Sequence, residues 1–302
     1  MDLQVLHFFV TVAQEGSFTA AREKLHYAQS NLSTRIRQME EELGESLFYR
    51  QKRGVILTAK GEVFYDYARR ILAMSEEAEI AMRDMDHARG TLRIGSIEAA
   101  AFGDLPALFS SYHREYPDVK LSLTTDLNDI FQNLVLNRNL DGAFVAESLG
   151  HSELNEMFLK KDRLILVKSM EDQTEDIREL LQKEPLITFP EGSIFRRRLE
   201  RWLADSGIVC GHQPIILNSL GAQLVNISAG LGVGYLPESI VSASIRQGLM
   251  KACTLEEEDP YSNLDILFVY RKDHIMDAAF RYFLEKVENA AKKDVSTVVS
   301  LL

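Results

Sequence analysis

One long helix constrains the fold of this chain most. From Gly61 to His87 the sequence contains no proline and no internal glycine. Its apolar residues alternate in steps of three and four, the pattern of a helix that packs along one narrow seam: Phe64, Tyr67, Ile71, Met74, Ala78, Ala81 and Met85. We expect this seam to join two copies of the chain, and packing of the helix on its own domain is the alternative.

The residues before this helix are expected to form short helices with sharp ends, followed by a hairpin. The apolar spacing predicts helices over 3–13, 18–25 and 29–43, then two short strands at 47–48 and 55–57. Gly16 and Gly44 end the first and third helices, and Ser17 is suited to cap the second. Two helices joined by a tight turn are a helix-turn-helix candidate, whose second helix enters the major groove of DNA.

The third helix has the side chains for such a role. If Leu32, Ile36 and Met39 face the core, the opposite face presents short polar and forked side chains that suit hydrogen bonding to base edges: Gln29, Ser30, Asn31, Ser33, Thr34, Arg35, Arg37 and Gln38. An ordinary solvated helix is the alternative for this element taken alone.

The charge is unevenly distributed along the chain. The formal charge of the whole is 34 − 45 = −11, which by itself argues against a nucleic-acid-binding protein. Residues 16–60, however, contain eight Lys and Arg against five Glu, a local charge of +3. A basic head on an acidic body is therefore expected.

Residues 92–290 alternate between strands and helices, which predicts a parallel α/β body. The expected strands are 92–97, 119–124, 142–145, 164–167, 186–189, 214–217, 233–235 and 264–270. The expected helices are 102–115, 128–136, 194–205, 221–229 and 275–290. The tail 292–302 shows no clear pattern.

Several classes of protein and site are disfavoured by the sequence. The N-terminus lacks a signal peptide and no run of 18 apolar residues exists, so we expect a cytoplasmic protein without a membrane span. No metal-ligand spacing, phosphate-binding loop or nucleophile–base motif is present, so neither a cofactor nor an enzymatic activity is expected. An enzyme or solute-binding module on the α/β body is the second hypothesis, and a redox sensor using Cys210 and Cys253 is the third.

Several dispersed segments resemble the LysR-type transcriptional regulators. In the first 61 residues these are Leu6–Val10, Gly16–Ala21, Gln29–Ser33, Ile36–Gly44, Leu47–Arg50 and Leu57–Gly61. Later segments are Leu92–Ser96, Leu140–Ala143 and Ala229–Pro237. The resemblance implies a DNA-binding regulator controlled by a small-molecule effector, with an N-terminal all-α winged helix-turn-helix and a two-lobed α/β body like a periplasmic binding protein.

The resemblance also implies a domain order. The winged helix-turn-helix domain would span 1–60 and the linker helix 61–87. The effector domain would span 88–302, with lobe one at 91–163 plus 266–292 and lobe two at 164–265. Implied partners are double-stranded promoter DNA, a small effector, RNA polymerase and further copies of the chain, as a dimer or a dimer of dimers.

Residue roles follow from the same resemblance. The helix-turn-helix would run from Phe18 and Thr19 to Arg37, with base contacts from Gln29, Ser30 and Thr34 and phosphate or edge contacts from Ser33, Arg35 and Arg37. Asn31, on the same polar face, is a further DNA-contact candidate. Arg50, Lys52 and Arg53 would contact the neighbouring backbone or minor groove. Many members have proline at the position of Ser30 and arginine at that of Thr34, so their base preference is not transferred.

The effector is expected at strand ends and helix starts between the lobes. The candidates are Ser96, Ile97, Glu98, Thr125, Ser193, Phe195, Arg196, Asn218 and Ser219, with Asp126 as the alternative to Thr125. Ser193 with Arg196 suits an anion, whereas the carboxylate of Glu98 opposes one and suits an amino group or an arginine. Ordinary helix capping is the alternative for each of these residues.

Overall fold

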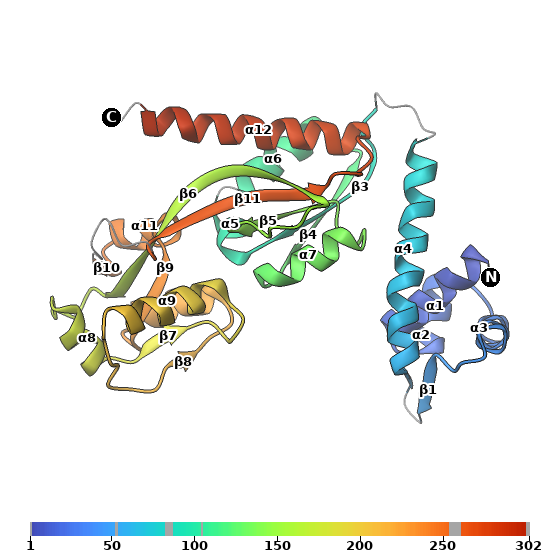
Figure 1. Cartoon of the computed structure of the whole chain (residues 1–302), viewed down its shortest axis with the longest axis horizontal. Helices are drawn as coiled ribbons and strands as arrows, with labels where there is room; N and C mark the ends of the chain where they lie inside the picture. Colours follow the sequence, from blue (N-terminus) through green and yellow to red (C-terminus); the bar gives the residue numbers. More distant parts are fainter. Residues whose placement is uncertain (1, 52–53, 82–86, 104, 254–260, 300–302) are drawn as a thin grey trace. The chain divides into compact units, whose positions relative to one another are not determined.

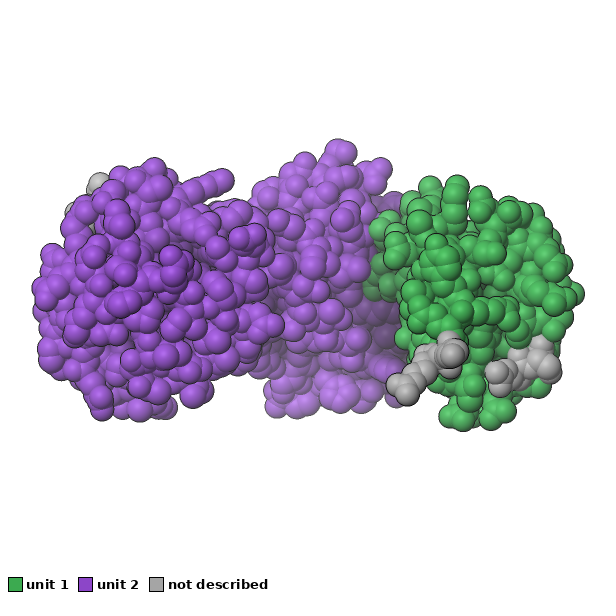
Figure 2. Space-filling view, turned by 90° about the horizontal axis from the view of Figure 1, so that it is seen from below, with its two compact units in different colours: residues 1–85, 137–139 green, residues 86–136, 140–302 purple. Residues whose placement is uncertain are grey.

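The computed structural model describes residues 2–51, 54–81, 87–103, 105–253 and 261–299. For Gln29, Ser30, Ile80, Ala81 and residues 293–299 it describes the backbone only. The predicted contact residues Lys52, Arg53 and Met85 lie outside the described part. The chain divides into two compact units, residues 1–85 with 137–139 and residues 86–136 with 140–302 (Figure 2).

The first unit is a small helical domain with a two-stranded hairpin. Its elements are α1 (Leu3–Glu15), α2 (Phe18–Leu25), α3 (Gln29–Leu43), β1 (Phe48–Gln51), β2 (Gly54–Leu57) and α4 (Ala59–Ala81) (Figure 1). The predicted boundaries are confirmed where local signals set them. The Ser17 hydroxyl accepts hydrogen bonds from the Thr19 and Ala20 amides, and Gly16 and Gly44 end α1 and α3 in the left-handed conformation. Phe9, Leu32 and Ile36 form the centre of its core, fully buried.

The second unit is a mixed α/β body in two halves. The first half contains β3 (Gly90–Ser96), α5 (Glu98–Phe102), α6 (Leu105–Glu115), β4 (Val119–Thr125), α7 (Asn128–Leu136) and β5 (Gly142–Ala146). The second contains α8 (Ile177–Lys183), β7 (Leu186–Thr188), α9 (Ile194–Asp205), β8 (Ile215–Ile216), α10 (Leu220–Ser228), β9 (Val233–Pro237), α11 (Glu238–Arg246) and β10 (Met250–Cys253). The strands β6 (Leu154–Ser169) and β11 (Asn263–Arg271) connect the halves, and α12 (Ala278–Val299) packs on β6, α6 and β3.

The prediction of a parallel sheet is wrong for its centre. The strand order is β4-β3-β5-β11-β6-β9-β7-β8, with β10 beside β6. The pairs β3–β4, β3–β5, β7–β8 and β7–β9 are parallel, whereas β11 and β6 pair antiparallel with each other and with their outer neighbours β5 and β9. Figure 1 shows β6 and β11 as the two long strands that run from one half to the other. The boundaries expected between the lobes, at 163/164 and 265/266, fall inside these strands.

Other elements differ from the sequence expectation. The helix expected over 102–115 is two helices, α5 and α6, with Gly103 ending the first. The strand expected over 164–167 is the end of the much longer β6. The elements α8, α11 and β10 were not expected, and α12 extends to Val299, well past the expected end at 290.

Candidate DNA-binding surface and ligand cavity

The two faces of α3 differ sharply in burial. Leu32 and Ile36 are fully buried and Met39 is 3% exposed, so these three side chains fix the rotation of the helix on the core. The opposite face is exposed at Asn31, Thr34, Arg35, Arg37 and Gln38, and Ser33 is half-buried. The side chains of Gln29 and Ser30, where base contacts are also expected, lie outside the described atoms. The described part of α3 thus presents a polar, basic surface of fixed orientation.

A carboxylate ties α3 to the hairpin. The Oε1 atom of Glu40 accepts hydrogen bonds from the backbone amides of Leu47, at 2.7 Å, and Phe48, at 3.2 Å. Charge-assisted bonds of this kind hold the start of β1 in register with the last turns of the helix. This role was not predicted, although a Glu near the helix end followed by a strand is a readable signal.

Phe18 and Arg50, both predicted DNA contacts, touch each other. The Arg50 guanidinium lies 5.4 Å from the centre of the Phe18 ring, and that ring packs against Phe48 at 6.0 Å. Phe18 therefore contributes to the core edge, while Arg50 and Thr19 are exposed. Arg37 forms an ion pair with Glu41 at 3.3 Å, and such a surface pair competes only weakly with a phosphate.

The predicted dimer seam on α4 divides between two environments. Phe64 and Ile71 pack against the core of their own unit, which was the alternative considered for this helix. Tyr67 and Met74 are 57% and 56% exposed, and Ala78 is also exposed. Val63, outside the predicted seam, is 58% exposed. Val63, Tyr67, Met74 and Ala78 form the exposed apolar stripe of α4.

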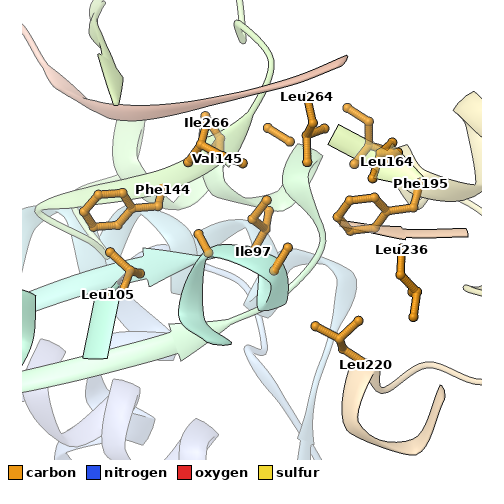
Figure 3. Close-up of a cluster of buried hydrophobic side chains, with 14 of the residues drawn as sticks. Ile97, Leu105, Phe144, Val145, Leu164, Phe195, Leu220, Leu236, Leu264 and Ile266 are labelled. Carbon is orange, nitrogen blue, oxygen red and sulfur yellow. The ribbon is translucent and has the colours of Figure 1, made fainter. Parts of the chain in front are cut away.

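A cavity of about 400 Å³ lies between the two halves of the second unit. Its polar lining residues are Glu98, Thr125, Asp126, Asn128, Ser193 and Asn218. Its apolar lining residues are Ile97, Leu127, Phe189, Pro190, Ile194 and Phe195. Two of the apolar lining residues, Ile97 and Phe195, belong to the cluster of buried hydrophobic side chains that Figure 3 shows. The volume and the mixed lining are typical of a small-molecule site.

The structure brings six of the nine predicted effector residues to this cavity: Ile97, Glu98, Thr125, Ser193, Phe195 and Asn218. Ser96 is fully buried, and its hydroxyl donates to the carbonyl of Ile97. Ser193 and Arg196, expected to bind an anion together, do not both face the cavity. Arg196 does not line the cavity and instead forms a hydrogen-bonded ion pair with Glu200 at 2.7 Å and a longer ion pair with Glu191 at 3.7 Å.

Glu98 occupies the start of α10. Its Oε2 atom accepts the Leu220 amide at 2.8 Å, and the Ser219 hydroxyl lies 3.4 Å from Oε1. The carboxylate is stabilised there by the positive end of the helix dipole. Because Glu98 belongs to one half and α10 to the other, this contact bridges the two halves. Ser219 acts mainly as the helix cap, which was the alternative for this residue.

Two arginines of α9 form further bridges that were not predicted from the sequence. Arg197 bonds Asp129 of α7 at 3.1 Å and the carbonyl of Gly192 at 2.7 Å. Arg198 donates from Nε to Glu147 at 2.8 Å, and its Nη1 bonds the carbonyls of Tyr261, at 3.2 Å, and Asn263. Two ion pairs and one carboxylate–amide hydrogen bond thus join the two halves around a cavity of mixed polar and apolar lining.

The remaining candidate chemistry is not supported by the described residues. Within them, no three His, Cys, Asp or Glu side chains gather where they could hold a metal ion. Burial raises the pKa of the Cys210 and Cys253 thiols, which lowers their thiolate fraction and disfavours the redox-sensor hypothesis. Among the helices described, none is both long and apolar enough to cross a membrane.

Two family models match the chain. Residues 3–62 match the bacterial regulatory helix-turn-helix protein, lysR family, and residues 85–292 match the LysR substrate binding domain. The first match covers α1 to β2 and the first turn of α4, and the second covers most of the α/β body, including all the residues that line its cavity.

Relatives match over nearly the full length. YofA of Bacillus subtilis, an HTH-type transcriptional regulator, is 37% identical over 95% of this chain and 98% of its own. CzcR of Bacillus anthracis, another such regulator, is 35% identical over 95% and 97%. A full-length OxyR variant from Pseudomonas aeruginosa has the same fold, with a TM-score of 0.71, 23% identity and coverage of 97% and 95%. The structure of full-length CbnR in complex with its target DNA has a TM-score of 0.69 and 22% sequence identity. The match covers 96% of this chain and 100% of the CbnR chain.

These matches agree with the sequence resemblance. The relatives are named transcriptional regulators rather than enzymes, and the two matched models supply the DNA-binding and ligand-binding parts. The chain belongs to the LysR family of DNA-binding transcriptional regulators.

Proposed function

We propose that the exposed face of α3 reads promoter DNA and that the exposed hairpin residue Arg50 anchors the adjacent backbone. The observation that carries this proposal is the fixed orientation of α3. Its apolar face is fully buried, Glu40 joins its end to β1, and Asn31, Thr34 and Arg35 remain exposed on the other side. Short polar side chains suit base edges, and arginines suit phosphates.

This assignment predicts different effects of Thr34→Ala and Arg35→Ala on DNA binding. Thr34→Ala should weaken binding to the DNA upstream of the protein's own coding sequence by about tenfold, with little change on a random duplex. Arg35→Ala should weaken binding to both duplexes and reduce the slope of log affinity against log salt by about 1. Fluorescence anisotropy of the full chain at several salt concentrations measures both effects.

The control for these variants is Lys120→Ala, which removes an exposed cation from the second unit. It should leave affinity and salt slope unchanged. If Thr34→Ala and Arg35→Ala each bound both duplexes as tightly as the control Lys120→Ala, the role of α3 in DNA reading would be refuted.

For the second unit we propose that the effector binds in the cavity between the halves. The bridges from Glu98, Arg197 and Arg198 are then the contacts whose strength differs between open and closed lobes, which is what control by a ligand requires. We further propose that the protein works in the cytoplasm, where promoter DNA and RNA polymerase are present. The proposed domain division is 1–60 for DNA binding, 61–87 for the linker helix and 88–302 for the effector.

The exposed apolar stripe of α4 is proposed to join two copies of the chain. Replacing Tyr67 and Met74 together with Glu should raise the dissociation constant of the dimer by about 100-fold, because two half-exposed apolar side chains would become charged in the interface. Sedimentation velocity measures the change. The matched control is Asp66→Lys, an exposed position on the same helix outside the stripe. An unchanged dimer in the double variant would place the interface elsewhere.

A further inference from the structure

The start of α9 presents hydrogen-bond donors to the cavity. Ser193 precedes this twelve-residue helix, is only 3% exposed, lines the cavity and makes no side-chain capping bond. The backbone amides of the first helical turn have no intrahelical acceptor, so this end of the helix favours a negative group. The start of α10 differs, since Glu98 already accepts the Leu220 amide.

The cavity also has an acidic side. Glu98 and Asp126 both line it, and its described lining residues include no Lys, Arg or His. The arginines at the start of α9 are engaged elsewhere, Arg196 with Glu200 and Arg197 with Asp129. Asp126 accepts a hydrogen bond from the Leu127 amide at 2.7 Å, and Glu98 accepts one from the Leu220 amide. Each carboxylate has further lone pairs that can accept hydrogen bonds from a ligand.

The donors at the start of α9 and the carboxylates of Glu98 and Asp126 together disfavour ligands that carry charge of only one sign. A simple anion at Ser193 would lie in a cavity with two carboxylates and no compensating cation among the described lining residues, which is unfavourable. A simple amine would satisfy the carboxylates but leave the Ser193 hydroxyl and the amides of α9 without an acceptor. A ligand with both groups meets both requirements.

We infer, on the basis of the proposed effector role of this cavity, that the effector is a small zwitterion of the amino-acid type with an apolar side chain. Its carboxylate binds Ser193 and the amino end of α9. Its ammonium group faces Glu98 and Asp126. Its side chain packs against the apolar wall formed by Ile97, Phe189 and Phe195.

The test uses calorimetric titration of the full chain with matched ligands. The zwitterions are L-leucine, L-methionine and L-phenylalanine. The deaminated counterparts of leucine and phenylalanine are 4-methylpentanoate and 3-phenylpropanoate, and the decarboxylated ones are 3-methylbutylamine and 2-phenylethylamine. We expect at least one amino acid to bind at millimolar concentration or below, and about tenfold or more tighter than its two counterparts.

Variants then assign the two charged groups. Asp126→Asn preserves the shape and the turn acceptor of an exposed side chain, and should weaken amino-acid binding about tenfold while improving binding of the deaminated acid. Ser193→Ala should weaken the zwitterion and the acid together. Arg196→Gln, at a neighbouring residue that does not line the cavity, is the control and should change neither. A misfolded variant would lose both ligands, so the opposite shifts in Asp126→Asn identify a charge effect.

The measurements distinguish a ligand that is not a zwitterion from an effector that binds outside the cavity. Binding of the deaminated acids alone, or of the amines alone, would overturn the zwitterion and keep the cavity as the site. Binding of none of the amino acids at millimolar concentration would also overturn it. Equal binding of an amino acid to the wild type and to Thr125→Trp, which places an indole at the cavity lining, would instead refute the cavity as the effector site.

Discussion

Replacing Gly61 with alanine is expected to destabilise the first unit by about 3 kcal/mol. A Cβ atom at Gly61 would lie 2.1 Å from the carbonyl oxygen of Leu47 and 3.2 Å from Cδ2 of Leu57. The first of these contacts is with backbone, which cannot rotate away. The amide of Gly61 also donates to Oγ1 of Thr58 at 2.9 Å, which anchors the first turn of α4 against the hairpin.

Intrinsic helix propensity opposes this effect and is smaller. Alanine favours a helix over glycine by about 1 kcal/mol, so a freely exposed position would be stabilised by the same substitution. Here the overlap with Leu47 requires α4 and β1 to separate, and Glu40, which accepts the Leu47 amide, would be displaced with them. The loss of stability should therefore be accompanied by weaker DNA binding, since the same contacts orient α3.

Thermal and urea unfolding of the full chain, followed through the transition of the first unit, measure the change in its free energy of unfolding in Gly61→Ala. Gly44→Ala is the control, because Gly44 has φ +69° and a Cβ atom added to it would meet no atom within 4 Å. Its cost should be the strain of the left-handed conformation alone, about 1 kcal/mol. Equal stability of Gly61→Ala and the wild type would contradict the close approach of α4 to the hairpin.

The first unit was predictable because its boundaries depend on local chemistry. Glycines that end helices, a serine cap and apolar residues at steps of three and four act within one turn of the chain, and all of them are legible in the sequence. The division of α4 was less accessible. Phe64 and Tyr67 belong to the same heptad pattern, yet only Phe64 packs inward, because α1 lies along one side of the helix.

The second unit was predicted less completely, since its centre depends on contacts distant in sequence. Alternation of strands and helices indicated α/β, but the direction of β6 and β11 is set by their pairing with each other across about a hundred residues. At the cavity, the expectation that a ligand binds at strand ends and helix starts correctly identified six of the lining residues. The pairing of Arg196 with Glu200, four residues later on the same helix, was a legible warning against its use as an anion ligand.

Arg198→Ala is expected to cost the second unit about 2 kcal/mol. The guanidinium joins α9 to Glu147, which follows β5, and to the carbonyls of Tyr261 and Asn263 at the entry to β11. Its side chain is 16% exposed, so the bonds form largely away from water. Glu147 is 44% exposed and can regain water after the truncation, which limits the loss below that of a fully buried pair.

The control is Arg201→Ala, which removes an exposed arginine from the same helix and should change stability by less than about 0.5 kcal/mol. Differential scanning calorimetry of the full chain separates the transition of the second unit from that of the first. An unchanged second transition in Arg198→Ala would show that the bridge contributes nothing.

The Arg198 bridge should also link stability to ligand binding. The first turn of α9 carries Ser193 and Phe195 to the cavity, and Arg198 is one turn further along the same helix. A ligand that binds only the folded, closed lobes raises the melting temperature, by an amount that grows with the logarithm of the ratio of ligand concentration to dissociation constant. Loosening α9 lowers the population of that state, so the melting-temperature increase caused by a bound amino acid should shrink in Arg198→Ala and persist in Arg201→Ala. Loss of the increase in both variants would mean that the helix surface, rather than this bridge, determines the response.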